Sequence, residues 1–450
     1  MAKFNLADMA VEICPNNRIF TDDTGLPSAV VYIPKFKNSD VLTGGDDNTH
    51  PAFIVNGVEI PGFYYSKFQN INHEGTAYSL PDEDPVYGSS FETALECCEA
   101  KGHGWHLSTN AEWAAIALWC KKNGFLPYGN NDDGKDAREN IYKARPTQYG
   151  RVTTGTGPLT WSHDGTEAGI WDMNGNVHEW QGGLRIVWGE LQILADNNAA
   201  DLKNSQSKES ASWRAINAAD GTLVEPECKT TDTTKTAKKD GATVRITVEP
   251  IDAAEEFFRV VYSTQNSTAV SNYSGLGVYC EFSDTVCDST IGTEAKLMLQ
   301  ALALVPEENG ALGDGTFGPD IWANEQLLRR GGTLVPGGIF TASFAVRGKP
   351  AASTGFRAVY VNPDAYEITF VIRGDWETEN EAKSFTTALG RTWSEYITAG
   401  DGTGYGLMIV DGLVKATAGT TQLYTSAGVE VKATDQITNG ESYVAAHPEL

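Results

Sequence analysis

Two consecutive helices, each with its own start and stop signals, restrict the fold of this chain more than any other feature. The first opens at Ser89-Ser90-Phe91-Glu92, a Ser-x-x-Glu capping box, and stops at Gly102. The second opens at Thr109-Asn110-Ala111-Glu112, another capping box, and ends at Lys121-Lys122-Asn123-Gly124, with cations at its C-terminal end. Each carries an apolar stripe at helical spacing that must face a core: Phe91, Ala94, Leu95 and Cys98, then Trp113, Ile116, Ala117 and Cys120.

The rest of the sequence predicts short strands and loops. After residue 125 the helical period disappears, and Gly, Asn, Asp, Thr and Trp dominate, which is typical of functional surface held on a scaffold. Runs of β-branched and aromatic residues predict strands at 30–36, 53–60, 62–68 and 243–248. Two helices followed by many short strands indicate the α+β class.

Composition marks two further segments. The stretch from Asn198 to Asp240 is polar and of low complexity, so we interpret roughly 198–300 as an insertion with a hairpin of its own. A helix is expected there around 294–302. A change in amino-acid composition at Asn362-Pro363-Asp364 predicts a small C-terminal α+β or β-rich domain over 362–450. We expect that domain to hold a helix through 382–389 and strands at 366–372, 406–410 and 429–433.

Charge restricts the class of partner. The sequence has 34 Lys and Arg against 59 Asp and Glu, a net charge of −25. This balance repels phosphate backbones and anionic lipid, so neither nucleic-acid binding nor electrostatic docking on a membrane is expected. No run reaches the roughly 18 apolar residues of a membrane span, so no membrane insertion is expected. The stretch from Met1 to Asp8 has no apolar core, and we therefore expect synthesis in a cytoplasm without a secretion signal.

The cysteines and histidines predict neither a disulfide scaffold nor a metal site. The seven cysteines include no CxxC pair, and we expect reduced thiols. Cys97 and Cys98 are neighbours on the first helix and point about 100° apart, so only Cys98 is expected on its apolar face. The seven histidines form no HxxxH or HxH group: His50, His73, His103, His106, His163, His178 and His447. No metal or cofactor is therefore predicted.

Four motifs follow one another in a recognisable order. They are His106 to Trp113 (HLSTNAEW), Gly169 to Trp180 (GIWDMNGNVHEW), Leu328 to Gly332 (LRRGG) and Thr354 to Val359 (TGFRAV). Together they resemble the formylglycine-generating-enzyme-like branch of the C-type lectin fold. The resemblance implies a C-type-lectin-like domain over 27–361 that contains the 198–300 insertion, preceded by an N-terminal segment 1–26 and followed by 362–450.

Most motif residues also have a structural interpretation. Trp113, Trp171 and Trp180 are large apolar anchors for a fold with little regular structure. Glu179 is interpreted either as a buried carboxylate bonded to backbone amides or, as in some enzymes of the resembled family, as a calcium ligand. His178 beside it is typical of a structural pair, because no second His or Cys lies at ligand spacing.

The enzymatic branch of the resembled family uses a close pair of reactive thiolates between Arg-Gly-Gly and Gly-Phe-Arg. Here the corresponding stretch, 333–353, contains no Cys, His, Asp or Glu. General acid–base chemistry therefore has no candidate within it. Cys280 and Cys287 lie upstream in the predicted insertion. These features disfavour an oxidase, and we expect no catalytic residue.

The same stretch fits another branch of this fold, the variable proteins of diversity-generating retroelements, which use it as a diversified binding surface. Phe340, Ala342, Phe344 and Val346 alternate with Thr341, Ser343, Ala345 and Arg347, the period of a strand with one buried face. The expected ligand-binding residues are the outward ones and an adjoining loop: Thr333, Leu334, Val335, Pro336, Thr341, Ser343, Ala345 and Arg347. The alternative is an ordinary edge strand.

This second resemblance implies a non-enzymatic receptor-binding protein with a hypervariable surface. The expected setting is a bacteriophage virion, on a tail tip or tail fibre assembled in the host cytoplasm. The expected ligand is a protein or glycan of the host-cell surface. Residues 362–450 would attach the domain to other virion proteins or form a homo-oligomer. Two alternatives stay open: an oxidase of the formylglycine-generating-enzyme type, and a purely structural virion protein.

Overall fold

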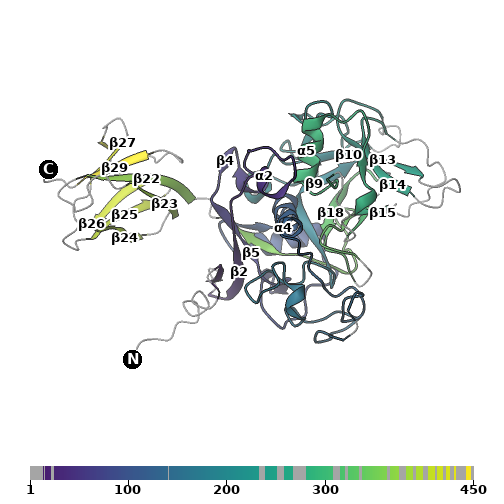
Figure 1. Cartoon of the computed structure of the whole chain (residues 1–450), viewed down its shortest axis with the longest axis horizontal. Coiled ribbons are helices and arrows are strands. Elements are labelled where there is room, and N and C mark those ends of the chain that lie inside the picture. Colours follow the sequence, from purple (N-terminus) through teal and green to yellow (C-terminus); the bar gives the residue numbers. More distant parts are fainter. Residues whose placement is uncertain are drawn as a thin grey trace. The chain divides into compact units, whose positions relative to one another are not determined.

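A computed structural model describes residues 14, 16–21, 25–139, 141–232, 239–250, 258–266, 280–307, 315–319, 323–333 and 337–361, and the backbone of eight strands between 365 and 446. Contacts divide the chain into two compact units, one of 1–57 with 62–361 and the other of 58–61 with 362–450 (Figure 1). Each unit is described by itself. No helix in the described part of the chain has the length and apolar character needed to cross a bilayer.

A five-stranded sheet joins the two ends of the first unit. Its order is β1 (Asn17–Thr21), β2 (Pro27–Pro34), β5 (Gly62–Ser66), β21 (Ala358–Tyr360) and β8 (Trp105–Leu107). β21 comes from the last residues of the unit and lies antiparallel between β5 and β8. The Gly-Phe-Arg motif, which directly precedes β21, is thereby brought against the early part of the chain.

The second sheet of this unit is larger. Its main path runs β15 (Cys280–Glu281), β17 (Thr316–Gly318), β19 (Ala342–Ala345), β18 (Gln326–Arg330), β9 (His178–Val187), β10 (Glu190–Ile193), β13 (Arg245–Pro250), β14 (Phe258–Ser263) and β16 (Val286–Cys287). Three short strands join it from the side: β11 (Arg214–Ile216), β12 (Leu223–Val224) and β20 (Thr354–Gly355). The hairpin expected within 198–300 is β13 and β14. It is continuous with the main sheet, because β13 pairs with β10.

Both predicted early helices are present, as α3 (Phe91–Glu99) and α4 (Asn110–Lys122). The capping box of α4 is confirmed, since Thr109 Oγ1 accepts from Glu112 N–H and Glu112 Oε2 accepts from Thr109 N–H. The box predicted for α3 is wrong. Its N-cap is Ser90, whose Oγ accepts from Thr93 N–H at 3.1 Å. The helix expected near 294–302 is α5 (Thr293–Ala301).

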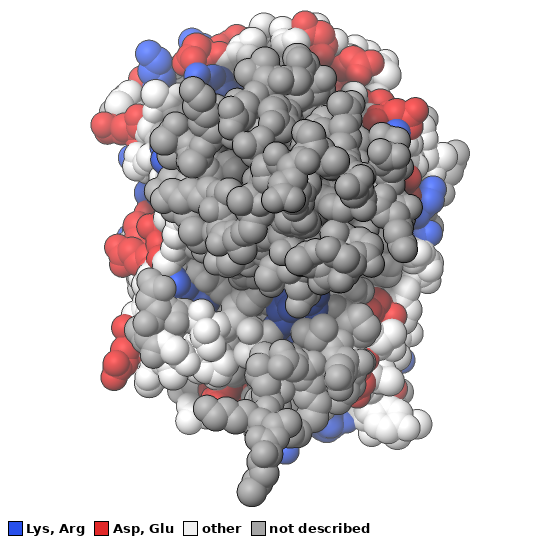
Figure 2. All heavy atoms as spheres, turned by 90° about the vertical axis from the view of Figure 1, so that its left-hand side faces the viewer, with Lys and Arg blue, Asp and Glu red and all other residues white. Residues whose placement is uncertain are grey.

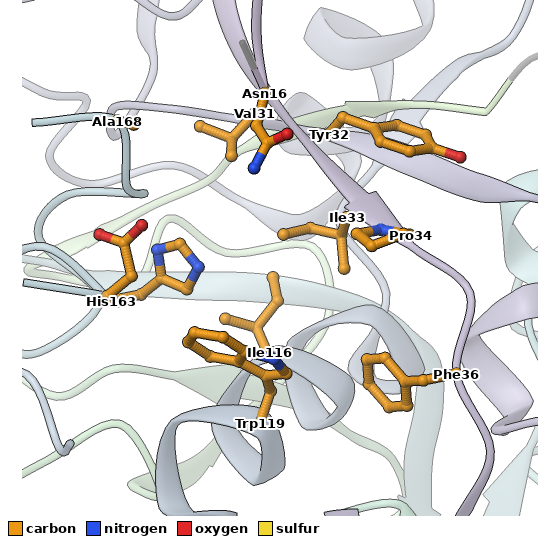
Figure 3. Close-up of a pocket in the computed structure, with 11 residues that line it drawn as sticks. Asn16, Val31, Tyr32, Ile33, Pro34, Phe36, Ile116, Trp119, His163 and Ala168 are labelled. Atoms are coloured by element: carbon orange, nitrogen blue, oxygen red, sulfur yellow. The ribbon is translucent and has the colours of Figure 1, made fainter. Parts of the chain in front are cut away.

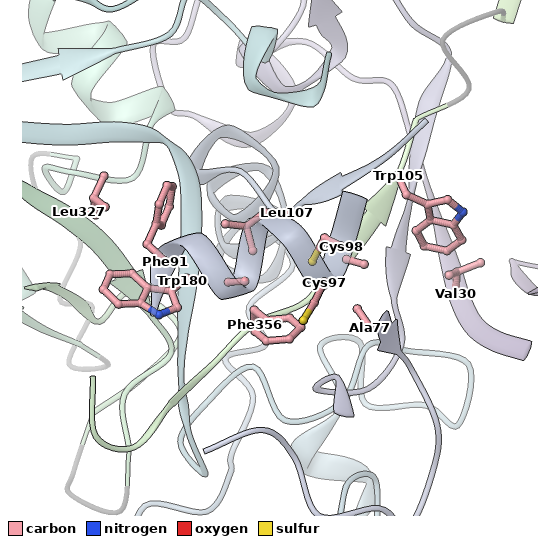
Figure 4. Packing of buried hydrophobic residues seen from close by; sticks show 12 residues of the cluster. Val30, Ala77, Phe91, Cys97, Cys98, Trp105, Leu107, Trp180, Leu327 and Phe356 are labelled. Atoms are coloured by element: carbon pink, nitrogen blue, oxygen red, sulfur yellow. The ribbon is translucent and has the colours of Figure 1, made fainter. Parts of the chain in front are cut away.

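The core of the first unit lies where α3 meets both sheets (Figure 4). Phe91 of α3 packs edge-on against Trp180 of β9, with ring centroids 5.8 Å apart, and Leu327 and Phe356 belong to the same cluster. Cys97 is as fully buried as Cys98, so the expectation that only Cys98 faces the core is wrong. The reason is that sheets cover two sides of α3, which widens its buried face.

The segment predicted as one strand over 53–60 is a 3-10 turn and a hairpin instead. The turn is η1 (Pro51–Phe53), and the hairpin pairs β3 (Ile54–Val55) with β4 (Val58–Glu59). Asn56 and Gly57 connect them with φ angles of 52° and 76°. Positive φ at both positions is typical of a type I′ hairpin turn, for which Asn-Gly is the preferred sequence. Smaller elements of this unit are α2 (Asn38–Val41), β6 (Ile71–His73), β7 (Thr76–Tyr78), η2 (Leu159–Trp161), η3 (Asn198–Ala200) and η5 (Phe282–Asp284).

The described part of the second unit consists of strands. One sheet has the order β23 (Ala382–Ala388), β22 (Ala365–Arg373), β29 (Ser442–Ala446), β27 (Gln422–Thr425) and β28 (Glu430–Val431), and a second joins β24 (Thr392–Thr398), β25 (Gly404–Val410) and β26 (Leu413–Ala418). The strands predicted at 366–372 and 406–410 are confirmed. The helix predicted through 382–389 is wrong, because β23 pairs with β22 along its whole length.

On the face that Figure 2 shows, acidic and basic side chains are both visible around the margin of the described surface. Among the described residues of this face, no extended basic surface is therefore visible.

Candidate ligand-binding site

The predicted binding strand is β19, and the structure places it inside the large sheet. It pairs with β18 on one side and with β17 on the other, so it is not the edge strand that the alternative interpretation expected. Thr341 is 2% exposed and Ser343 is 3% exposed. The predicted outward orientation of these two side chains is therefore wrong. Both faces of β19 are covered by other parts of the protein. The alternation in its sequence therefore does not distinguish a buried face from a solvent-exposed one.

The side chain of Thr341 forms hydrogen bonds within the protein instead. Its Oγ1 accepts hydrogen bonds from the backbone N–H of Gly338 at 2.9 Å and of Thr316 at 3.3 Å. It therefore holds the turn before β19 against the strand beside it. The hydroxyl of Ser343 is buried and has no hydrogen-bond partner in the described part of the chain. An unpaired buried hydroxyl contributes no stability and no accessible ligand contact.

The remaining predicted site residues are divided between the two ends of β19. Thr333 is half-buried and precedes the strand, and Leu334, Val335 and Pro336 lie outside the described residues. Ala345 and Arg347 are half-buried at the other end. The four residues of β19 span about 13 Å, so Thr333 and Arg347 lie near opposite ends of this strand. That they belong to one binding surface stays a prediction.

The chain returns to the surface directly after β19. Val346, which the alternation predicted as buried, is 42% exposed, and Gly348, Lys349 and Pro350 are also exposed. Among the described residues of the 333–353 stretch, the exposed ones therefore lie in the loop that follows β19. We refer to residues 346–352 as the exit loop.

Arg347 fastens the exit loop to two other elements. Its guanidinium pairs with Glu92 of α3 at 3.0 Å and with Glu325, just before β18, at 2.8 Å. A further nitrogen donates to the carbonyl of Gln206 at 3.0 Å. Glu325 also pairs with Arg185 at 2.9 Å. This network fixes the base of the exit loop, so that its tip has a defined position.

A polar hollow of about 420 Å³ borders Arg347. Its walls come from the exposed side of α3, from the loop at 199–208 and from Arg347 itself, and the lining residues are Glu92, Leu95, Glu99, Ala199, Leu202, Asn204, Ser205, Gln206, Ser207, Lys208 and Arg347. Charges of both signs and several hydroxyl and amide groups face this hollow. Such a surface suits contacts with a polar partner rather than capture of a dry, apolar ligand.

A second, smaller cavity of about 180 Å³ lies between β2 and α4 (Figure 3). Trp119, Tyr32 and Phe36 contribute aromatic rings to its wall, and His163 faces it from a loop. His163 Nδ1 accepts from the backbone N–H of Ile170 at 2.8 Å. Burial lowers the pKa of His163 to about 4, so the ring is neutral at physiological pH. No residue of the 333–353 stretch lines this cavity.

The four sequence motifs converge on one buried polar region. Glu179 forms a two-point ion pair with Arg357, with distances of 2.8 and 3.1 Å, and both side chains are fully buried. Arg330 donates to Asn110 Oδ1 at 3.0 and 2.8 Å, which ties β18 to the start of α4. Trp113 Nε1 donates to the carbonyl of Ile339 at 2.8 Å. The motifs thus hold the domain together across long sequence distances.

Burial alone would lower the pKa of Arg357, but the adjacent Glu179 outweighs this and holds the pKa above its ordinary value. The interpretation of Glu179 as a carboxylate bonded to backbone amides is wrong, since its partners are the side chains of Arg357 and Gln69. Sequence reasoning missed Gln69, because no local signal links it to Glu179, which lies 110 positions away.

A comparison with known protein families gives a match for part of the first unit. The FGE-sulfatase family model, described as the sulfatase-modifying factor enzyme 1-like domain, matches residues 40–187. The matched region contains α3, α4 and the Glu179 motif, and the Arg-Gly-Gly and Gly-Phe-Arg motifs follow it. No curated protein matches the chain. A unit made mostly of sheet with few helices agrees with the α+β, C-type-lectin-like fold of this domain.

Burial favours the protonated form of the thiols in the first unit. Burial raises the pKa of Cys228 and of Cys280 to about 11 and that of Cys287 to about 12, and it also raises the pKa of Cys97 and Cys98. A thiol becomes a nucleophile or a metal ligand as thiolate. These five cysteines are therefore poor nucleophiles at neutral pH. Among the described residues, no group of three or more His, Cys, Asp or Glu is arranged to hold a metal ion.

Proposed function

We propose that the first unit is a non-enzymatic binding domain that contacts its ligand through the exit loop, 346–352, and the adjoining polar hollow. The observation that carries the proposal is the position of the exit loop. It holds the exposed residues among those described in the 333–353 stretch, it is fastened at Arg347 by two carboxylates, and it borders a hollow of about 420 Å³. A fixed base with an exposed tip is a suitable support for a variable contact surface.

We further propose the biological setting that the second resemblance implies, a bacteriophage receptor-binding protein whose 333–353 stretch is diversified by a retroelement. Three features of this chain support a binding role over an oxidase. The stretch contains no thiol, acid or histidine. Six cysteines of the described chain have raised pKa values. The inward-pointing side chains of β19 itself are buried in the protein.

The binding test compares matched surface substitutions in the full chain. Val346→Asp places a charge on the exit loop, and Ile141→Asp places the same charge at a position outside the exit loop and the polar hollow, where Ile141 is 82% exposed. Labelled wild-type protein and both variants are incubated with a panel of intact bacterial cells. We expect the wild type and Ile141→Asp to bind the same cells and Val346→Asp to lose at least tenfold in affinity. Equal binding by all three proteins would contradict a contact through the exit loop.

The alternatives are tested with the same preparations. Incubation with cysteine-containing peptides, copper or iron, and oxygen should give no turnover, whereas peptide oxidation would favour the oxidase. A purely structural virion protein would bind isolated virus particles that lack this protein and would not bind cells.

Sequencing the locus across one population tests diversification. We expect variation at Thr333, Leu334, Val335, Pro336 and Ala345, with Arg347 kept as the residue that fastens the exit loop, and a nearby reverse transcriptase gene with an imperfect copy of the stretch.

A further inference from the structure

Four oxygen atoms converge on the side-chain amide nitrogen of Gln69. The carbonyl oxygens of Asp172, Gly175 and Val177 lie 3.2, 3.3 and 3.3 Å from Nε2, and Glu179 Oε1 lies at 3.0 Å. The other end of the carboxamide is also engaged, since Gln69 Oε1 accepts from Asn176 Nδ2 at 2.9 Å. The orientation of the amide is thereby fixed, with its nitrogen facing the four oxygens.

This arrangement contains more acceptors than the amide has hydrogens. A carboxamide nitrogen carries two N–H groups, so it can give full hydrogen bonds to two of the four oxygens. Several carbonyl oxygens and a carboxylate around one centre are the ligand set of a hard cation such as calcium, which takes six to eight oxygens. Gln69 is 1% exposed, so water does not reach this centre freely.

The carboxylate of Glu179 already has a counterion without a metal ion. Arg357 pairs with both oxygens of Glu179, and one of its nitrogens also donates to the carbonyl of Trp171 at 2.6 Å. Asp172 is a second buried carboxylate beside the cluster: its Oδ2 accepts from Gly155 N–H at 2.8 Å, and its Oδ1 has no hydrogen-bond partner among the described residues. The Gln69 nitrogen contacts the backbone carbonyl of Asp172 rather than this carboxylate.

We propose that the carboxamide of Gln69 takes the place of a bound cation. The calcium role that the family resemblance allows for Glu179 does not fit this chain, because the Gln69 nitrogen occupies the centre of the oxygen cluster. The hydrogen bonds of the cluster connect the loop before β6 to the Asp172–Glu179 turn. Removal of the Gln69 side chain would empty this centre and create a calcium site of three carbonyl oxygens, one carboxylate and water.

The test uses calcium alone as the probe. Wild type and Gln69→Ala, both as full chains, are melted in EDTA and in millimolar calcium chloride or magnesium chloride. We expect the wild-type Tm to be the same in all three buffers. Gln69→Ala should melt lower in EDTA, and calcium should raise its Tm by roughly 5 °C, the effect of a ligand well above its Kd. Magnesium should do less, because it requires shorter distances and octahedral geometry.

The matched control is Asn70→Ala. Asn70 is the neighbouring amide and is equally buried, but its Nδ2 donates to Ser66 Oγ and to the carbonyl of Phe68 and touches no part of the cluster. It should be destabilised without recovery in calcium. One calcium per wild-type chain by elemental analysis, or a wild-type Tm that rises with calcium, would overturn the proposal. If Gln69→Ala does not fold in any buffer, these wild-type measurements decide, and a calcium-free, calcium-insensitive wild type supports it.

Discussion

At the scale of single residues, the domain relies on polar side chains buried in defined hydrogen-bonding states. His50 Nδ1 accepts from Ala52 N–H at 3.2 Å, so its Nε2 carries the proton and donates to the carbonyl of Ala301 at 2.9 Å. Burial lowers the pKa of His50 to about 4 from the usual 6.5. The folded state therefore holds this ring neutral at a pH where the unfolded chain would protonate it.

The sign of the resulting pH dependence follows directly. Above pH 6.5 both states are neutral at His50, and as the pH falls towards about 4 only the unfolded state gains a proton, so the free energy of unfolding decreases. The shift corresponds to about 3 kcal/mol. In denaturant titrations from neutral pH to about pH 4, we expect His50→Asn to take up about one proton fewer on unfolding than wild type. Parallel pH profiles for the two proteins would contradict this assignment.

The candidate site shows what residue patterns can and cannot reveal. The sequence identified Glu179 and Arg357 as motif residues, but their pairing joins positions 178 apart and has no local signature. Arg347 was predicted as an outward contact, and the structure shows that Glu92 and Glu325 hold its guanidinium. Long-range ion pairs of this kind depend on the final arrangement of the elements, which spacing alone does not determine.

At the scale of elements, local signals identified most helices and strands but not which of their faces are buried. The capping box at Thr109 acts within one turn of helix, so its outcome depends little on the rest of the fold. The period of two in β19 indicates a strand correctly but not its exposure. Exposure depends on which strands lie beside it and what covers its faces, and β17 and β18 come from other parts of the sequence.

Substitutions in β19 test this account, because Thr341 and Ser343 were both predicted as variable positions. Thr341→Val leaves the backbone N–H groups of Gly338 and Thr316 without their acceptor, and we expect a loss of about 1–3 kcal/mol. Ser343→Ala removes a buried hydroxyl that has no partner, and we expect no loss or a small gain. Urea unfolding of the two single variants measures both effects. Equal tolerance of the two substitutions would show that Thr341 is exposed as the sequence pattern implied.

At the scale of the whole molecule, the last strand of the first unit completes a sheet that begins near its start. β21 lies between β5 and β8, and Phe356, Ala358 and Val359 are fully buried. Arg357, in the same segment, supplies the partner of Glu179. The order of the motifs in the sequence predicted that these segments belong to one domain. It did not predict that β21 lies between β5 and β8, or that β20 pairs with β9 in the other sheet.

Truncation tests where the folding unit ends. A chain that stops at Val361 keeps β21 and all of its pairing partners, and we expect it to unfold cooperatively with a Tm within a few degrees of the matching transition of the full chain. A chain that stops at Ser353 loses β20, β21, Phe356 and Arg357, which leaves the carboxylate of Glu179 buried without its cation. Loss of a buried partner of this kind costs about 3–5 kcal/mol before the lost core is counted. We therefore expect the shorter chain to lack a cooperative transition by circular dichroism and calorimetry. If the chain ending at Val361 also failed to fold, residues 362–450 would be part of the same cooperative unit.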